Sequence, residues 1–171
     1  MASDKLLFLH GADGYAEDRV IADGLGSALG VAVDFPELPG EDMSYESWAR
    51  VIRDHLRALS SRDIVVAHSF GASILLCVLA EERREFPTRA TLLAMPDWSP
   101  DGWGVSEYAF TGPEPDALLS LHHCRDDEVV DFDHLALNAR ALPSARLIEH
   151  SSGGHQFNGL IDAIASDIGG R

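Results

Sequence analysis

The sequence predicts an α/β fold: a single domain over residues 1–171 with an open, mostly parallel sheet of about six strands and helices on both faces. Strand-like and helix-like segments alternate along the whole chain, as in sheets built from βαβ units. Several strand-like segments are also apolar throughout, which is typical of strands covered by helices on both sides. The 171 residues are 46% hydrophobic, which suffices for one sizeable core.

The first three elements follow from apolar spacing and one glycine. Residues 6–9 form a continuous apolar run of strand length. Residues 17–29 place apolar side chains at helical spacing, and Gly30 is expected to end this helix as its C′ residue. Residues 31–35 then form the next predicted strand.

The middle of the chain contains the clearest helical pattern. Over residues 44–59, apolar side chains recur three and four positions apart, and Ser44 is expected to cap the helix. A short β-type run at 64–66 follows. The apolar run at 72–80 is long enough to form a helix.

The second half continues the alternation. Strands are predicted over 90–94 and 118–123, with a helix over 132–142 after them. A last strand over 145–149 and a last helix over 160–168 complete the chain. Because parallel strands need crossover connections, this alternation favours right-handed βαβ units.

The junction between strand 64–66 and helix 72–80 carries the most informative motif, Ala67-His68-Ser69-Phe70-Gly71. A serine between small residues at such a junction is typical of a sharp, strained turn that exposes the serine side chain above the sheet. The motif resembles the nucleophile elbow of the α/β-hydrolase family, which has glycine where this chain has Ala67. The resemblance implies that Ser69 is a nucleophile.

The same resemblance implies a minimal α/β-hydrolase fold. The family's usual core has eight strands, and the two missing here would be its first antiparallel pair. Residues 96–116 are irregular and rich in proline and glycine. This segment lies where family members often insert a cap over the site, although it is too short to form a cap domain. A loop of this length is usually functional or mobile.

A serine nucleophile needs a histidine base and an acid that orients the histidine. His155 follows the last predicted strand in a glycine-rich loop, and loops at the carboxyl ends of parallel strands form ligand sites. Asp127 lies in a run, residues 125–130, that resembles the family's acid loop, and Asp126 and Asp97 are alternatives. The chain order of Ser69, Asp127 and His155 is the family's order.

The intermediate of acyl transfer needs an oxyanion hole. The backbone N–H of Phe70 is the first expected donor, because it follows the nucleophile. The His-Gly pair after the first strand resembles the family's oxyanion loop, which implies Ala12 as the second donor. Further substrate-binding residues are expected in this loop, the elbow and the irregular segment: Gly11, His68, Trp98 and Trp103.

Charge and cysteine content limit the partners. The formal net charge is −15, a surface that repels nucleic acid and anionic membranes. Cys77 and Cys124 lack metal-ligand or redox spacing, so no metal is expected, and no cofactor is implied. The first residues lack the layout of a signal peptide, and no apolar run approaches the roughly 20 residues of a membrane span. A cytoplasmic protein is therefore expected.

Together these features predict a serine hydrolase that cleaves carboxylic esters of small or medium acyl groups through an acyl-enzyme. A thioesterase or an acyltransferase using the same three residues is an alternative. A non-catalytic interaction module on the same fold is another alternative. The expected partner is a small-molecule ester, and the sequence does not indicate an oligomeric state.

Overall fold

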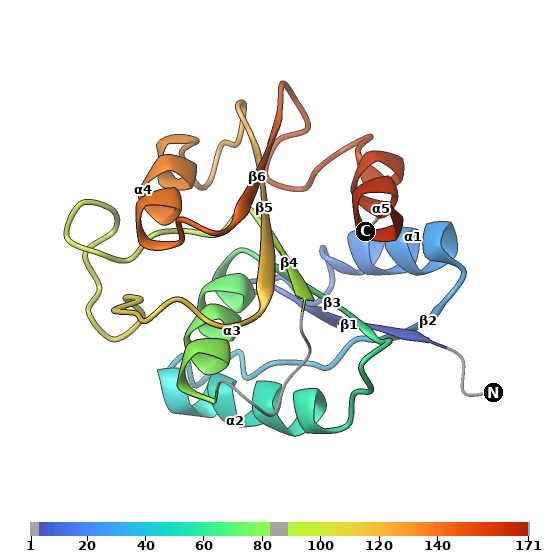
Figure 1. Cartoon of the computed structure of the whole chain (residues 1–171), viewed down its shortest axis with the longest axis horizontal. Coiled ribbons are helices and arrows are strands. Elements are labelled where there is room, and N and C mark those ends of the chain that lie inside the picture. Colours follow the sequence, from blue (N-terminus) through green and yellow to red (C-terminus); the bar gives the residue numbers. More distant parts are fainter. Residues whose placement is uncertain (1–3, 83–88, 171) are drawn as a thin grey trace.

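The computed structural model describes residues 4–82 and 89–170, which form one six-stranded, fully parallel sheet (Figure 1). The order across the sheet is β2-β1-β3-β4-β5-β6, so the predicted open parallel sheet is confirmed. The strands are β1 (Lys5–Leu9), β2 (Ala32–Asp34), β3 (Ile64–His68), β4 (Arg89–Leu93), β5 (Leu118–Cys124) and β6 (Arg146–His150).

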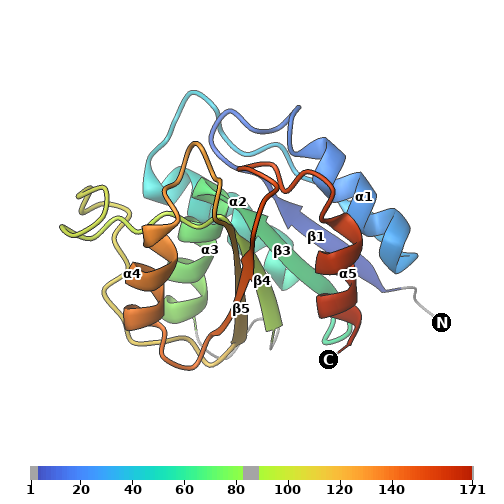
Figure 2. The same ribbon diagram turned by 90° about the horizontal axis from the view of Figure 1, so that it is seen from above.

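Five helices within the described ranges cover the two faces of the sheet, as Figure 2 shows. Helices α2, α3 and α4 pack on one face, and α1 and α5 pack together on the other. Helices on both faces were predicted and are confirmed. The helices are α1 (Arg19–Leu29), α2 (Tyr45–Arg57), α3 (Phe70–Glu81), α4 (Asp133–Ala141) and α5 (Ile161–Gly169).

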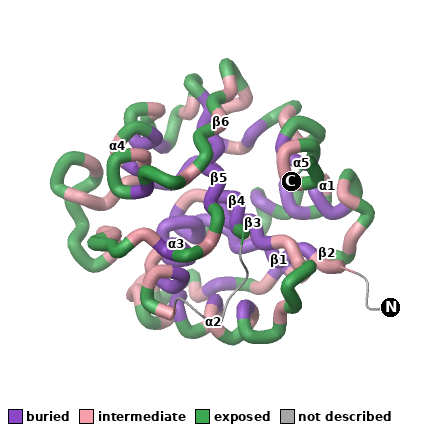
Figure 3. The backbone as a smooth tube through the Cα atoms, viewed as in Figure 1, coloured by how far each residue is buried: buried purple, intermediate pink, exposed green. Residues whose placement is uncertain are grey.

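The two faces of the sheet build two hydrophobic clusters, because successive side chains of a strand point to opposite sides. In β1, Leu7 and Leu9 join the cluster under α2 and α3, while Leu6 and Phe8 join the cluster under α1 and α5. All four side chains are fully buried, which explains why the strand is apolar throughout. Figure 3 shows the same buried centre in the middle strands.

The element bounds lie close to those predicted, with two informative differences. Helix α3 begins at Phe70 rather than at 72, directly after the serine of the elbow. Helix α1 begins at Arg19 rather than at 17, because a turn closed by the Asp18 N–H and the Gly14 carbonyl precedes it. The predicted caps are present: Ser44 Oγ accepts the Ser47 N–H at 3.4 Å, and Gly30 has a φ of 69°.

The strand order places the site. Strand β1 lies between β2 and β3. The chain therefore adds β2 on one side of β1 and then adds β3 on the other side. In open α/β sheets, ligands bind at the carboxyl ends of the strands where the order reverses in this way. The loop after β1 and the elbow after β3 both lie at this position.

Across the described residues, none of the helices combines the length and the apolar character needed to cross a lipid bilayer.

Candidate active site

Ser69 occupies a strained turn between β3 and α3. Its φ is 52°, a region that residues other than glycine rarely adopt and that costs about 1–2 kcal/mol. The surrounding backbone holds this conformation, since the Ser69 N–H donates to the Leu93 carbonyl at 2.8 Å. Gly71 permits close packing on β1, because a Cβ there would lie 2.3 Å from the His10 carbonyl oxygen.

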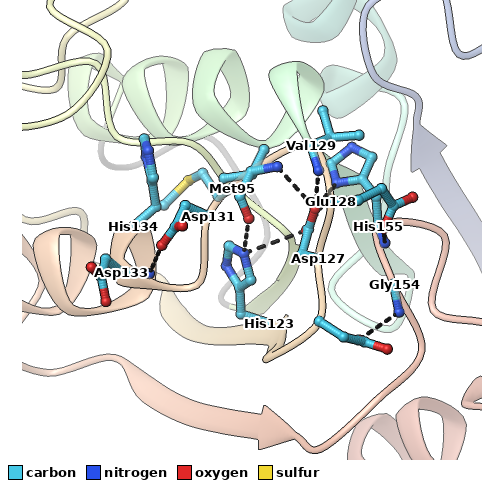
Figure 4. Close-up of polar contacts among 12 residues, drawn as sticks. Met95, His123, Asp127, Glu128, Val129, Asp131, Asp133, His134, Gly154 and His155 are labelled. Carbon is cyan, nitrogen blue, oxygen red and sulfur yellow. Dashed lines mark hydrogen bonds and ion pairs between the residues drawn. The ribbon is translucent and has the colours of Figure 1, made fainter.

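His155 and Asp127 form a hydrogen-bonded pair at the carboxyl ends of β6 and β5 (Figure 4). The His155 Nδ1 lies 2.9 Å from Asp127 Oδ2 and 3.1 Å from Oδ1. The backbone N–H groups of Val129 and Val130 also donate to Asp127 Oδ1, each at 2.9 Å. The carboxylate is therefore fixed from two sides, and it fixes the orientation of the imidazole.

The same contacts keep Asp127 ionised. Burial raises the pKa of this carboxyl group, but the hydrogen bond from His155 and the two backbone donors outweigh the effect. The net result is a pKa below its ordinary value. A buried carboxylate held in its charged form can stabilise positive charge on the neighbouring imidazole.

The two alternative acids lie elsewhere. Asp126 accepts the N–H groups of Gly153 and Gly154, so it holds the His155 loop rather than the imidazole. Asp97 accepts the hydroxyl of Ser99 within its own segment. Of the three carboxylates, only Asp127 contacts the His155 ring in the described structure.

The loop after β1 packs directly against Ser69. A Cβ at Gly11 would lie 3.0 Å from Ser69 Cβ and 3.6 Å from Ser69 Oγ. This loop and the start of α3 border a common cleft, to which Ala12 and Phe70 both contribute. The two backbone donors expected for an oxyanion hole thus belong to one cavity with Ser69 and His155.

The cleft has a volume of about 490 Å³ and a largely aromatic wall. Trp98 lines it while also anchoring residues 96–116, since its Nε1–H donates to Ser73 Oγ at 2.8 Å. The ring of Trp98 lies 4.9 Å from that of Trp103 and 5.0 Å from that of Tyr108. The larger apolar side chains of the lining are Met43, Phe70, Trp98, Trp103, Tyr108 and Val129.

His68 borders the cleft but its ring is turned into the protein. The side chain is buried, with Nδ1 2.8 Å from Asp18 Oδ2 and Nε2 2.9 Å from the His155 carbonyl oxygen. Both ring nitrogens therefore bind to the framework of the site, and the expected contact of His68 with substrate stays a prediction.

Three features of the site were not anticipated from the sequence. Asp18 Oδ2 accepts the Gly11 N–H at 2.8 Å, and Glu128 Oε2 accepts the His155 N–H at 3.0 Å. Tyr108 reaches the cleft wall and bonds to the Met43 carbonyl through its hydroxyl. The Glu128 and Tyr108 contacts span 27 and 65 positions, so a local pattern could not indicate them, whereas the Asp18 contact spans seven. The sequence placed Asp18 inside the predicted helix over 17–29, whereas in the structure it directly precedes α1.

Comparisons with known proteins agree with this fold. The ydeN gene product from B. subtilis superposes with a TM-score of 0.75 at 18% identity, over 99% of this chain and 100% of that chain. Est1E from Butyrivibrio proteoclasticus gives 0.72 at 14% identity, over 97% and 85% of the two chains. A pyrethroid hydrolase from Sphingobium faniae JZ-2 gives 0.69 at 13% identity, over 99% and 97%.

At these identities the structural neighbours establish the fold, which is that of the α/β hydrolases. The search of curated proteins gives no match. The family model for serine hydrolases matches residues 22–158, which is most of the chain and includes Ser69, Asp127 and His155. The chain therefore belongs to the serine hydrolase family and has the α/β-hydrolase fold that its elbow motif implied.

Proposed function

We propose that this hydrolase cleaves neutral carboxylic esters of small or medium acyl groups through a covalent acyl-enzyme on Ser69. The observation that carries the proposal is the convergence of three parts on one cleft. These are a serine on a strained turn, a histidine whose Nδ1 is bound to a buried carboxylate, and a loop packed against the serine.

In the first half of the reaction, Ser69 Oγ attacks the ester carbonyl carbon while His155 Nε2 accepts the hydroxyl proton. Asp127 holds the Nδ1–H tautomer of His155 and stabilises the imidazolium. The backbone N–H groups of Ala12 and Phe70 donate to the oxyanion of the tetrahedral intermediate. Its collapse breaks the bond to the alcohol, which leaves with the proton from His155.

In the second half, water attacks the carbonyl carbon of the acyl-enzyme. His155 accepts a proton from this water and then returns it to Ser69 Oγ as the acid is released. The proton balance closes over the two halves, so a hydrolysis of this kind needs no group beyond the side chains and the backbone donors already described.

The cleft supports a neutral, apolar acyl group. Its volume of about 490 Å³ falls within the usual range for small-molecule sites. Glu17 and Asp18 are its acidic lining residues, and the described lining includes neither lysine nor arginine to bind an anion. One structural neighbour, Est1E, has been crystallised with ferulic acid, an aromatic acid, in a structure of TM-score 0.71 to this chain.

The test is labelling with a fluorophosphonate, which reacts only with an activated serine, followed by mass spectrometry of the modified peptide. We expect the label on Ser69, and we expect Ser69→Ala and His155→Ala to abolish both labelling and ester turnover. Ser151→Ala changes an exposed serine and serves as the matched control. Label on another residue, or no label on the folded protein, would contradict the proposal and favour a non-catalytic module.

A further inference from the structure

His68 lies between the Asp18 carboxyl group and the His155 carbonyl oxygen. When Asp18 is ionised, both of these groups are hydrogen-bond acceptors and neither can donate. The His68 Nδ1 faces the Asp18 carboxylate at 2.8 Å, and its Nε2 faces the His155 carbonyl oxygen at 2.9 Å. A neutral imidazole carries one N–H and could satisfy only one of these acceptors. Both contacts are satisfied when both ring nitrogens carry hydrogen, which makes the ring an imidazolium ion.

His10 provides an internal contrast nearby. Its Nδ1 donates to the Gly11 carbonyl at 2.7 Å, while its Nε2 accepts the Leu38 N–H at 2.9 Å. One donor and one acceptor are what a neutral imidazole offers. Burial lowers the pKa of His10, and a positive charge on His68 lowers it further. The two buried histidines beside the elbow therefore require different protonation states.

The other groups that face His68 are compatible with its charge. Asp18 is equally buried, with a side chain 1% exposed, and supplies the opposite charge. Burial raises the pKa of Asp18, but the hydrogen bond and charge of His68 and the Gly11 N–H leave it below its ordinary value. The His155 ring lies 4.6 Å away between centroids, and its Nδ1 is bound to Asp127.

The contacts of this pair reach each part of the site. Asp18 Oδ2 also accepts the Gly11 N–H at 2.8 Å, which holds the loop that packs against Ser69. His68 directly precedes Ser69 in the chain, and its Nε2–H holds the His155 main chain. Charge-assisted hydrogen bonds of this kind are shorter and stronger than neutral ones.

We propose that Asp18 and His68 form a buried carboxylate–imidazolium pair that positions the oxyanion loop and the His155 loop around Ser69. The inference rests on the proposed function, because positioning matters only if these loops take part in catalysis. Asp18 and His68 are positioning residues: they act through Gly11 and His155 and transfer no proton to substrate.

The charge state is tested on the wild-type protein by ¹⁵N–¹H NMR of the histidine rings. We expect both ring nitrogens of His68 to carry slowly exchanging hydrogens, and His10 to carry one. A single N–H on His68 would show a neutral ring and would overturn the proposal. This arm needs no variant and no substrate.

The positioning role is tested with Asp18→Asn, which keeps the shape of the side chain and removes its charge. We expect kcat and the fluorophosphonate labelling rate to fall about 10- to 100-fold, the scale of a misplaced reacting group, with little change in KM. We also expect His68 to lose one N–H signal. Asp23→Asn, at an exposed position of α1, should match the wild type in all three readouts.

The outcomes separate the two proposals. An unlabelled wild-type protein would contradict the proposed function itself. A labelled wild type, together with a folded Asp18→Asn variant that is labelled equally fast, would overturn only the positioning role. If Asp18→Asn does not fold, Gly14→Ala offers a second route, because its Cβ would lie 2.9 Å from Asp18 Oδ2 and 3.1 Å from the Gly11 carbonyl oxygen and would disturb both sides of the contact between Asp18 and Gly11. We expect the same selective loss of kcat in that variant.

Discussion

Asp127 shows how a single residue can be both buried and charged. Its side chain is completely enclosed, yet it accepts hydrogen bonds from His155 and from two backbone N–H groups. His123 Nε2 lies 3.4 Å from Asp127 Oδ2 and donates its hydrogen to the Val130 carbonyl. Burial raises the pKa of the carboxyl group, and the hydrogen bonds from His155, Val129 and Val130 lower it below its ordinary value.

The first prediction follows from this arrangement. Asp127→Asn should lower kcat by about 10³- to 10⁴-fold, because the amide favours the wrong imidazole tautomer. Asp97→Asn, which changes a carboxylate bound within its own segment, should stay near the wild type. Steady-state kinetics on one neutral ester checks all three proteins. A larger loss in Asp97→Asn than in Asp127→Asn would show that the acid has been assigned to the wrong strand.

The second prediction concerns acid stability. The ordinary aspartate pKa is 3.8, and Asp18 and Asp127 have lower values in the folded protein. The unfolded chain therefore binds more protons than the folded protein as the pH falls below about 4. The stability that these two carboxylates contribute is present above that pH and is lost below it. Urea denaturation at a series of pH values should show this loss, and Asp127→Asn should show a smaller one. Equal losses in the two proteins would contradict the prediction.

At the residue scale, the sequence indicated the site residues that belong to local motifs and did not indicate contacts between residues far apart in the chain. Ser69 was predicted because its turn needs small neighbours at fixed positions, and His155 because it follows a strand in a glycine-rich loop. Asp127 was predicted because its run resembles the acid loop of the family. The contact between Asp18 and His68 spans 50 positions, and no spacing rule connects a helix start with a strand end. The roles of Ser69, Asp127 and His155 stay predictions until the variants are measured.

At the element scale, α3 is the most enclosed helix. It begins at the elbow, and nearly all of its first residues are buried, because it packs on the centre of the sheet and also contacts α2. This burial explains an apolar run without a polar face, which is typical of a helix covered on all sides. The start of the helix must approach β1 closely, and Gly71 makes the approach possible.

The third prediction tests this contact. A methyl group at position 71 would lie 2.3 Å from the His10 carbonyl oxygen and 3.0 Å from that of Leu9. Both atoms belong to the backbone at the end of a central strand, so relief requires moving the strand or the helix. Gly71→Ala should therefore lower the free energy of unfolding by about 1–3 kcal/mol, the usual cost of overpacking, and reduce activity with it.

The matched control for this test is Gly169→Ala, at the end of α5, where a Cβ would meet nothing within 4 Å. Denaturant titration of the two variants beside the wild type measures the difference in stability. A Gly71→Ala protein as stable as Gly169→Ala would show that the junction between α3 and β1 can relax. The close packing would then not be a requirement of the elbow.

Residues 96–116 mark the limit of prediction at this scale. The prolines and glycines correctly excluded helix and strand, but they could not show which surface the segment contacts. The structure ties it to α3 through Trp98 and Ser73, and the Ser73 hydroxyl also donates to the Pro96 carbonyl at 3.1 Å. Trp98 therefore both anchors the segment and lines the cleft.

At the scale of the whole molecule, the parallel sheet was predictable because βαβ alternation leaves few other arrangements. The order of the strands was not predictable. After β2, the chain adds its next strand, β3, on the opposite side of β1, and the spacing of apolar residues does not indicate on which side a strand is added. This change of side brings the loop after β1 next to the elbow after β3. The candidate site thus depends on a topological choice that local patterns do not encode.

Net charge is the other property of the whole molecule that bears on function. The chain carries 28 acidic residues against 13 lysines and arginines, for a formal charge of −15. A field of this sign lowers the local concentration of anions and raises that of cations. The cleft adds to the effect through Glu17, an exposed acidic residue of its lining, whereas the charge of Asp18 is paired with that of His68.

The fourth prediction is that the protein discriminates against anionic esters, and that salt weakens the discrimination. For two phenyl esters of equal acyl length, a neutral butyrate and an anionic hemisuccinate, kcat/KM should be at least about tenfold lower for the anion at low ionic strength. Raising the salt concentration from about 0.01 M to 1 M shortens the screening length from about 30 Å to 3 Å. The ratio of kcat/KM for the two esters should then approach the value set by their intrinsic reactivity, without the effect of the protein's charge. A cationic ester of similar size should show the opposite salt dependence. Equal rates for the two phenyl esters at every salt concentration would show that the protein's charge does not influence which esters reach Ser69.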